Sequence, residues 1–399
     1  MNIHGKVGKM FKIIRQGHLF SPEDRGIKDI LIFRGKIARI NEDLSYLGKQ
    51  LEAEVIHADG KVLVPGFIDQ HVHFLGGGDY EGPAGATTDI AFSSLTKSGV
   101  TTAVGCLGSD DTARNMLDLM RRARDLDNLG ITTYLYSGSF NVPSPTITGN
   151  VRRDVMMVDK ILGVKFAISE VMASHTSLME LAEVAKDSFL GGLISGKRGL
   201  IHIHIGKKLE RMEPLFEILK ITNIPIDYFI PTHVNRLTPN VMEHAIHFLK
   251  IGGTVDMSAI MSPETGSPTS LRPDYALSEF LKSGIPIERI TLSSDGNVSM
   301  PIFDKNGNKT GLFNAGVDHL YRTFLMMVKN CKIPFSDILK VVTSNVARVL
   351  GIEDRKGSIE VGKDADLIVF NKDYEIEMVF AHGQIMVEKG KAVIGSYFE

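Results

Sequence analysis

The chain has 399 residues, of which 43% are hydrophobic and 23% are charged. This composition is typical of soluble globular proteins and excludes a disordered or fibrous chain. The 45 Lys and Arg residues nearly balance the 47 Asp and Glu residues, which argues against nucleic acid or an acidic membrane surface as a partner. The two cysteines, Cys106 and Cys331, are too few for a disulfide framework. Because the N-terminus also lacks a secretory apolar stretch, and no apolar run reaches about 20 residues, we expect a cytoplasmic enzyme or binding protein for a small molecule.

Both ends of the chain have the pattern of short β-strands. Apolar stretches such as DILIFRGKIARI near the start and DADLIVFN near the end are separated by polar turns. Each end is too small to bury a core alone. We therefore predict that residues 1–62 and 353–399 pack together as a discontinuous β-sandwich domain.

The central segment, residues 63–352, alternates apolar runs with amphipathic segments, as βα units do. The expected strands are residues 64–74, 101–108, 132–138, 161–169, 199–206, 227–234, 253–259 and 289–295. The expected helices have apolar spacing near 3.6 and are residues 88–99, 112–130, 177–193, 214–222, 241–253 and 276–284. This pattern predicts an α/β fold, a distorted (β/α)8 TIM barrel. Residues 261–275 contain three prolines and predict a long loop at the barrel mouth, placed as a lid.

Two histidines in the first predicted strand suggest a metal site. A single residue separates His71 from His73. On a strand both imidazoles therefore project from one face, about 6–7 Å apart along the chain. A pattern this short is also common among ordinary polar side chains. Four other predicted strands, however, end in a residue that could complete the site: Lys165, His204, His233 and Asp295.

The spacing of these residues supports the site. Their separations correspond to three, one, one and two βα units of roughly 30 residues, which places them on strands 1, 4, 5, 6 and 8. Barrel enzymes take their catalytic residues from the carboxyl ends of different strands. Neutral imidazoles suit zinc, and Asp295 can bind metal and accept a proton from metal-bound water. Lys165 has no acceptor as an ammonium group; it either becomes a bridging carbamate by reaction with carbon dioxide or pairs with a nearby acid.

Several motifs together resemble a known family. The elements PGFIDQHVH, GVKFAIS, PTHVNR, TLSSDGN and GSIEVGKDADLIVF are similar to those of the amidohydrolase superfamily and, within it, of the bacterial isoaspartyl dipeptidases. The resemblance covers almost the whole chain. It implies a homo-oligomer with two divalent ions, zinc in that family, and carboxylated Lys165 as their bridge. The ligands that it implies are His71, His73, Lys165, His204, His233 and Asp295.

The resemblance also implies a reaction and a substrate pocket. A hydroxide bridging the two metals would attack an amide carbonyl, and Asp295 would carry the proton to the leaving amine. Arg236 matches an arginine that binds the substrate's carboxylate. Ser299 matches a serine near the amino-acid head of the substrate, and Ser109 matches a threonine in the pocket. Without the resemblance, Arg236 could be a surface charge and the serines ordinary turn residues.

Three positions depart from the family's pattern, and all concern the substrate. Phe140 replaces a tyrosine whose hydroxyl would donate to the oxyanion, and losing such a donor costs about 2.7–4 kcal/mol. Met172 replaces a second carboxylate-binding arginine, and a thioether cannot hold a carboxylate. Tyr80 stands at an acidic position that recognises the substrate's amino group, with Glu81 one residue later.

These departures leave alternatives open. The first is a related amidohydrolase that acts on an N-acyl amino acid or a cyclic amide. The second is a non-catalytic binding or assembly protein, although every metal ligand is present. Three further residues near the predicted ligands can be interpreted from the sequence. His202 is either a partner of a metal ligand or a satisfied core residue, Asp69 is an orienting or structural acid, and Cys106 is a core residue.

Overall fold

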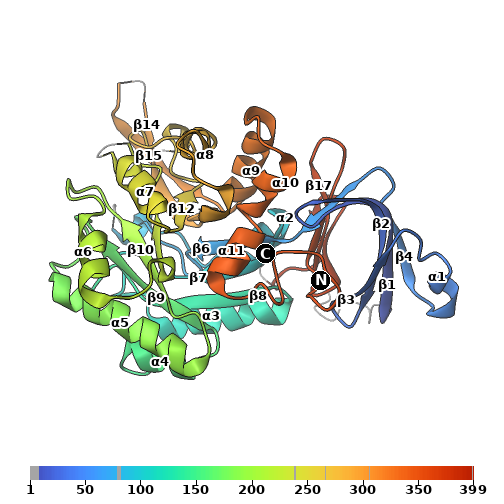
Figure 1. The fold of residues 1–399 in the computed structure, drawn as a ribbon, viewed down its shortest axis with the longest axis horizontal. Coiled ribbons are helices and arrows are strands. Elements are labelled where there is room, and N and C mark those ends of the chain that lie inside the picture. Colours follow the sequence, from blue (N-terminus) through green and yellow to red (C-terminus); the bar gives the residue numbers. More distant parts are fainter. Residues whose placement is uncertain (1–8, 79–81, 238–239, 266, 305, 398) are drawn as a thin grey trace.

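The computed structural model describes residues 9–78, 82–237, 240–265, 267–304, 306–397 and 399. The described residues form a parallel eight-stranded barrel with a strongly curved, nine-stranded sheet beside it (Figure 1). The C-terminal Glu399 lies against the start of α2 (Phe92–Lys97), where its carboxylate accepts from the backbone amides of Phe92 and Ser93 (Figure 1).

Every predicted barrel strand is present. The strands are β6 (Phe67–Val72), β7 (Val100–Gly105), β8 (Thr132–Gly138), β9 (Ile161–Ile168), β10 (Leu200–Ile205), β11 (Phe229–Thr232), β12 (Val255–Ser258) and β13 (Ile290–Ser293). They pair in chain order from β6 to β13. The first and last strands meet where the backbone amide of Asp295 donates to the carbonyl of His71 at 3.1 Å. Because helices cover the outside and side chains fill the inside, these strands are buried on both faces and read as apolar runs. The (β/α)8 prediction is confirmed.

The six predicted helices are also present. They are α2 (Phe92–Lys97), α3 (Met116–Leu129), α5 (Leu178–Ser195), α6 (Glu213–Thr222), α7 (Val241–Lys250) and α8 (Pro273–Lys282). The helix α5 shows why its ends were readable: Ser177 and Glu180 form a capping box at its start, and Gly196 ends it in the left-handed conformation. None of the described helices is both long enough and apolar enough to span a bilayer.

The structure adds elements that the sequence pattern did not reveal. These are the helices α1 (Leu47–Gln50), α4 (Val151–Met157), α9 (Asp318–Asn330), α10 (Phe335–Lys340) and α11 (Ser344–Leu350), and the hairpin of β14 (Val298–Phe303) and β15 (Lys309–Ala315). Four short 3₁₀ turns also occur, at Pro83–Gly85, Ile226–Tyr228, Pro263–Thr265 and Ile287–Arg289. Most of these elements are too short to show a clear periodicity. The hairpin matters most, because it follows β13 directly and stands at the barrel mouth.

Strands from the two chain ends combine in the curved sheet, whereas the domain bounds 1–62 and 353–399 stay a prediction. Their strands are β1 (Phe11–Phe20), β2 (Asp24–Phe33), β3 (Lys36–Asn41), β4 (Glu54–His57), β5 (Val62–Pro65), β16 (Leu367–Phe370), β17 (Ile376–Ala381), β18 (Gln384–Glu388) and β19 (Lys391–Ala392). The antiparallel pairing of β5 with β16, in which Val64 faces Ile368, joins the two ends. One apolar cluster contains Ile30 from the first end and Leu367 from the last. Neither end could bury these side chains without the other.

Candidate metal centre

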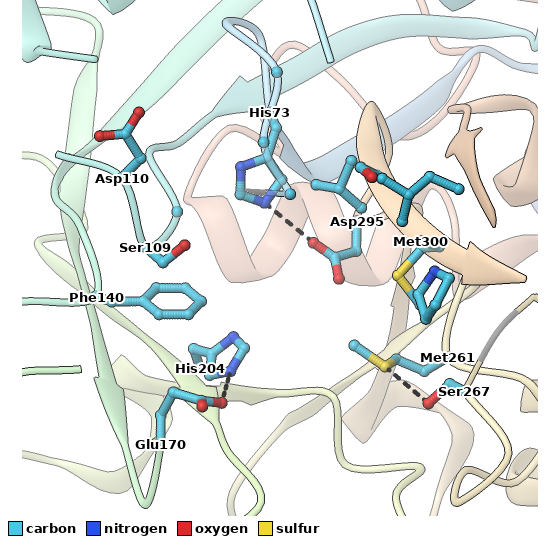
Figure 2. A pocket seen from close by; sticks show the side chains of 18 of the residues that line it. His73, Ser109, Asp110, Phe140, Glu170, His204, Met261, Ser267, Asp295 and Met300 are labelled. Atoms are coloured by element: carbon cyan, nitrogen blue, oxygen red, sulfur yellow. Dashed lines mark hydrogen bonds and ion pairs between the residues drawn. The ribbon is translucent and has the colours of Figure 1, made fainter. Parts of the chain in front are cut away.

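The barrel brings the predicted strand-end residues together. The Asp295 carboxylate is the common neighbour of three histidines. Its Oδ1 lies 3.3 Å from Nε2 of His71 and 3.2 Å from Nε2 of His73, and its Oδ2 lies 3.7 Å from Nδ1 of His233. Figure 2 shows His73, His204 and Asp295 around one cavity. Residues that the sequence separations placed on strands 1, 5, 6 and 8 therefore lie close together in the structure.

Several residues at this edge of the barrel have a left-handed backbone conformation. Ser169, His233 and Asp295 each follow a barrel strand and have φ values of 53°, 67° and 54°. A residue with a Cβ pays roughly 1–2 kcal/mol to adopt this left-handed region. Such strain persists only where the surroundings fix the backbone, and it is common at functional sites. At Asp295 this turn points the carboxylate toward the histidines.

Lys165, on β9, lies inside the cluster. Its Nζ is 2.8 Å from Nε2 of His71 and donates to Sγ of Cys106 at 3.1 Å. It also lies 5.5 Å from the centre of the Phe140 ring. In the part of the chain that the structure describes, Lys165 forms no ion pair with a carboxylate. The alternative in which this lysine pairs with a nearby acid is therefore not found there.

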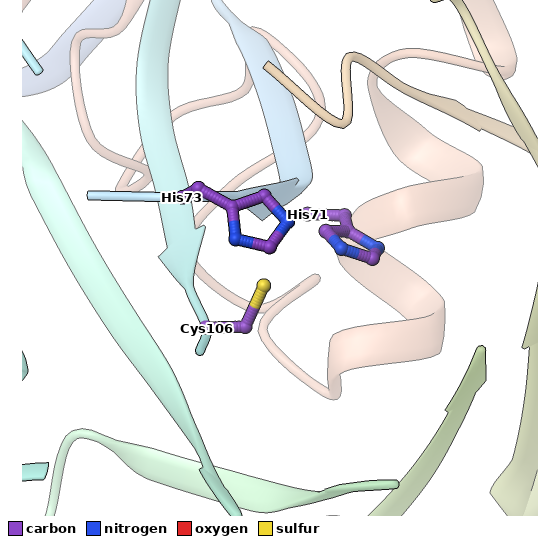
Figure 3. A group of neighbouring side chains, drawn as sticks. All are labelled: His71, His73 and Cys106. Carbon is purple, nitrogen blue, oxygen red and sulfur yellow. The ribbon is translucent and has the colours of Figure 1, made fainter. Parts of the chain in front are cut away.

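The histidines are held in the neutral form that binds metal. Burial lowers the pKa of His71, His73 and His233, and the nearby Lys165 charge lowers it further. Two sets of three side chains have donor atoms within 4.8 Å of one another. The first set is His71, His233 and Asp295. The second is His71, His73 and Cys106 (Figure 3). This donor set fits divalent metal ions, since it offers neutral imidazoles and an acidic oxygen.

His204 has a partner that the sequence interpretation overlooked. Its Nε2 lies 3.0 Å from Oε2 of Glu170, which follows β9 (Figure 2). Burial by itself would raise the pKa of Glu170, but the hydrogen bond and charge of His204 lower it to about 2. Burial lowers the pKa of His204 to about 4, although Glu170 opposes this shift. At neutral pH the pair is therefore an ionised carboxylate and a neutral imidazole. The sequence did contain a signal for this pair, because Glu170 comes directly after the predicted strand 161–169, whose neighbouring strand carries the predicted ligand His204.

His202 and Asp69, whose roles the sequence left open, both contact His71. His202 Nε2 lies 2.9 Å from Nδ1 of His71, and its ring stacks on Tyr136 with centroids 4.7 Å apart. This contact favours the interpretation of His202 as an orienting partner of His71. Asp69 accepts hydrogen bonds from the backbone amides of Ser294 at 3.0 Å and His71 at 3.3 Å. Burial raises the pKa of Asp69 to about 7, and its contacts join the first barrel strand to the residues after the last.

A cavity of about 310 Å³ opens above the cluster. Four of the predicted substrate-binding residues line it: Ser109, Phe140, Arg236 and Ser299. Arg236 is only 2% exposed, and its Nε donates to the carbonyl of Ile205 at 3.1 Å. The Ser299 hydroxyl is buried and has no hydrogen-bond partner among the described residues. The positions predicted for Tyr80 and Glu81 lie outside the described residues.

Other lining residues were not anticipated. Cations come from Arg114, Lys207 and Lys309, and an apolar wall comes from Met261, Val298, Met300, Pro301, Phe303 and Leu312. Met172 is not among the described lining residues; its backbone amide donates to Oε1 of Glu170 at 3.2 Å. The predicted lid segment 261–275 is fastened by Asn235, whose Nδ2 donates to the carbonyls of Met261 at 2.8 Å and Leu271 at 2.9 Å. Closure of this segment over a substrate stays a prediction.

A parallel barrel with neutral imidazoles and a carboxylate at its strand ends defines a class, the barrel hydrolases that work with bound metal ions. The comparisons place the chain within that class. Residues 62–386 match the model of the amidohydrolase family, and the chain belongs to this family. It is accordingly a hydrolytic enzyme that acts on amide bonds.

Individual relatives agree with this assignment. The crystal structure of a β-aspartyl dipeptidase from Fervidobacterium islandicum AW-1, in complex with β-Asp-Leu, is 36% identical with a TM-score of 0.86 over 96% of this chain and 98% of that one. An imidazolonepropionase from Rhizobium rhizogenes is 25% identical over 380 residues, 86% of this chain and 87% of the relative. A D-hydantoinase from Geobacillus stearothermophilus is 25% identical over 424 residues, 92% of this chain and 85% of the relative. The resemblance inferred from the motifs is confirmed.

Proposed function

We propose that the enzyme hydrolyses the isopeptide bond of β-aspartyl dipeptides at a centre of two divalent ions. The observation that carries this proposal is the cluster of His71, His73, His204, His233 and Asp295 beneath one cavity, in a chain 36% identical to a β-aspartyl dipeptidase. Zinc is the metal we expect, because imidazole donors suit it. A homo-oligomeric state and a cytoplasmic location stay predictions.

Six residues would hold the ions: the four histidines, Asp295 and Lys165. Carboxylation of Lys165 is supported by its surroundings, because an ammonium group buried against imidazoles without an acidic partner in the described chain is electrostatically unfavourable. A carbamate would replace that positive charge with a negative one that the ions can share. When bound, divalent ions make water acidic near neutral pH and polarise the substrate carbonyl.

The Asp295 carboxylate would move the proton. It is the one carboxylate within 3.3 Å of two of these imidazoles among the described residues, and it faces the cavity (Figure 2). In this position it can accept a proton from the attacking water and deliver it to the leaving amine. Positioned acid–base groups of this kind contribute about 10²- to 10⁴-fold in rate.

The substrate's carboxylate would lie between Arg236 and Lys207. Arg236 is fixed to the carbonyl of Ile205, at the end of β10, and Lys207 follows two residues later and lines the same cavity. Burial and the positive charge of Arg236 both lower the pKa of Lys207. Lys207 thus offers the second positive charge that Met172 cannot supply. Ser109 and Ser299 would bind the substrate's polar head.

A second candidate is hydrolysis of a cyclic amide or an N-acyl amino acid. The observation that favours it is Phe140, whose ring lies 4.1 Å from the ring of His204 and has no hydroxyl for an oxyanion. The apolar wall from the β14–β15 hairpin also suits an acyl group or a ring. Such a substrate would use the same ions with different contacts.

The test combines metal analysis with a substrate panel. Protein purified without chelator is analysed for metal and assayed with β-Asp-Leu, several N-acyl amino acids, and hydantoin and dihydrouracil as cyclic amides. Two metals per chain with hydrolysis of β-Asp-Leu would support the proposal. Hydrolysis of a cyclic or N-acyl amide alone would favour the second candidate, and a chain without metal or activity would contradict both.

A further inference from the structure

Cys106 is a buried nucleophilic group that the proposed function does not use. It follows β7 directly, is 1% exposed, and its backbone amide donates to the carbonyl of Val72 at 3.0 Å. Val72 lies between His71 and His73 in the sequence. The pairing of β6 with β7 therefore fixes Cys106 beside both histidines, and the placement does not depend on a flexible side chain.

The thiol faces nitrogen atoms. Its Sγ accepts a hydrogen bond from Nζ of Lys165 at 3.1 Å, and donor atoms of His71, His73 and Cys106 lie within 4.8 Å of one another. Figure 3 shows the sulfur pointing toward the two imidazole rings. Apolar side chains such as Ile68 and Val104 also cluster with Cys106, but its thiol has polar contacts with Nζ of Lys165 and, at 3.7 Å, with the carbonyl of Val72. The interpretation of Cys106 as core accounts for its burial but not for these contacts.

We propose that Cys106, as a thiolate, is a ligand of the ion held by His71 and His73. This inference rests on the proposed function, because it concerns the same metal centre. When the ion binds, the S–H bond breaks, the proton leaves to solvent, and a sulfur lone pair forms the bond to the metal. A thiolate makes the site softer than one of nitrogen and oxygen alone, so zinc and cadmium are favoured over magnesium and manganese.

The test uses cobalt as a spectroscopic probe. The metal-free full chain, Cys106→Ser and Cys331→Ser are loaded with Co²⁺, and cobalt content and absorption spectra are recorded. Cys331 is the matched control, because it is the other cysteine in the chain and its thiol contacts Ser278 and Asp274 instead. We expect a thiolate-to-cobalt charge-transfer band in wild type and Cys331→Ser that Cys106→Ser lacks. Zinc affinity of Cys106→Ser should fall by at least the 10- to 100-fold typical of lost partners of metal ligands.

The outcomes separate this inference from the proposed function. Bound cobalt without a charge-transfer band in wild type, or a band that persists in Cys106→Ser, would overturn the Cys106 assignment and leave the metal centre intact. Absence of bound cobalt in wild type would instead remove the metal centre and the proposed function with it. If Cys106→Ser fails to fold, X-ray absorption of the wild-type zinc protein decides: a sulfur scatterer at about 2.3 Å supports the assignment, and only nitrogen and oxygen at about 2.0–2.2 Å overturns it.

Discussion

The molecule contains two buried clusters of ionisable side chains that differ in how their charges are matched. At the junction of barrel and curved sheet, Nζ of Lys356 lies 2.9 Å from Oδ2 of Asp364 and 2.5 Å from Oδ2 of Asp366. The same nitrogen donates to Oγ1 of Thr132, at the start of β8, at 2.7 Å. At the barrel mouth, Lys165 contacts an imidazole and a thiol and has no carboxylate partner in the described chain.

This difference shows what each cluster is suited to do. A buried lysine between two carboxylates is satisfied within the protein, and removing it leaves uncompensated charge. The barrel-mouth cluster has the Asp295 carboxylate among several imidazoles, a thiol and a lysine. Its imidazole nitrogens, sulfur and carboxylate oxygens can therefore serve as ligands of a metal ion. We therefore expect substitutions in the junction cluster to change stability and substitutions at the barrel mouth to change activity.

The largest effect should follow Asp295→Asn. Loss of the proton carrier is expected to lower kcat/KM for the active substrate by about 10²- to 10⁴-fold, while the thermal midpoint changes little. Steady-state kinetics and thermal unfolding of the same preparation measure both. A variant that keeps a tenth of the wild-type kcat/KM would show that another group carries the proton.

The reverse result is expected for Lys356→Met. The substitution removes the shared partner of Asp364 and Asp366, although Asp364 keeps ion pairs with Lys36 and Arg355. Unfolding in urea should therefore show a loss of up to about 3–5 kcal/mol. The kcat of the folded enzyme should stay close to that of wild type. Adding Asp364→Asn and Asp366→Asn to Lys356→Met should recover part of the stability. No recovery would mean that packing of the lysine stem, and not its charge, stabilises the junction.

A smaller effect is expected for Lys207→Met at the cavity rim. If Lys207 binds the substrate's carboxylate together with Arg236, the substitution should raise KM for β-Asp-Leu about tenfold, since one charge-assisted hydrogen bond contributes about 1.5–3 kcal/mol. The matched substrate is β-aspartyl leucinamide, which lacks that carboxylate and should show no change. An equal increase in KM for both substrates would exclude a direct contact with the carboxylate.

The smallest effect that we expect is a dependence of stability on pH, which arises from Asp364 in the junction cluster. Burial alone would raise the pKa of Asp364, but the positive charge of Lys356 holds it below its ordinary value. A lowered folded-state pKa contributes stability that is present above the unfolded pKa of about 3.9 and is lost as pH falls. Urea midpoints of wild type should therefore decline from about pH 5 downward. Asp364→Asn should decline less steeply, and an identical slope would assign the loss to other carboxylates.

Much of the fold was predictable because its signals are local. Each barrel strand is a short apolar run, and helices such as α5 carry caps at both ends. Short elements were missed: α4 has seven residues, which is too few for a clear helical period, and the β14–β15 hairpin is partly buried without a regular alternation along either strand. Neither leaves a strong pattern in the sequence.

The site divides in a similar way. His71, His204 and Asp295 were identified because strand ends and spacing are visible in the sequence. Glu170, Lys207 and the thiol of Cys106 were not, because their roles depend on which side chains face them across neighbouring strands. No one-dimensional pattern records that the backbone amide of Cys106 donates to the carbonyl of Val72, or that Lys207 shares a cavity with Arg236.

The sequence by itself thus determined the barrel, the union of the two β-rich ends and the strand positions of the residues proposed to bind metal, because periodicity and spacing act along the chain. Only the tertiary structure decided which buried charged side chains form ion pairs within the protein and which side chains are available to bind a metal ion. Burial, register and strand-end turns set the distances between groups far apart in sequence, and those distances determine whether a buried lysine stabilises the fold at the junction or contributes to a metal centre at the barrel mouth.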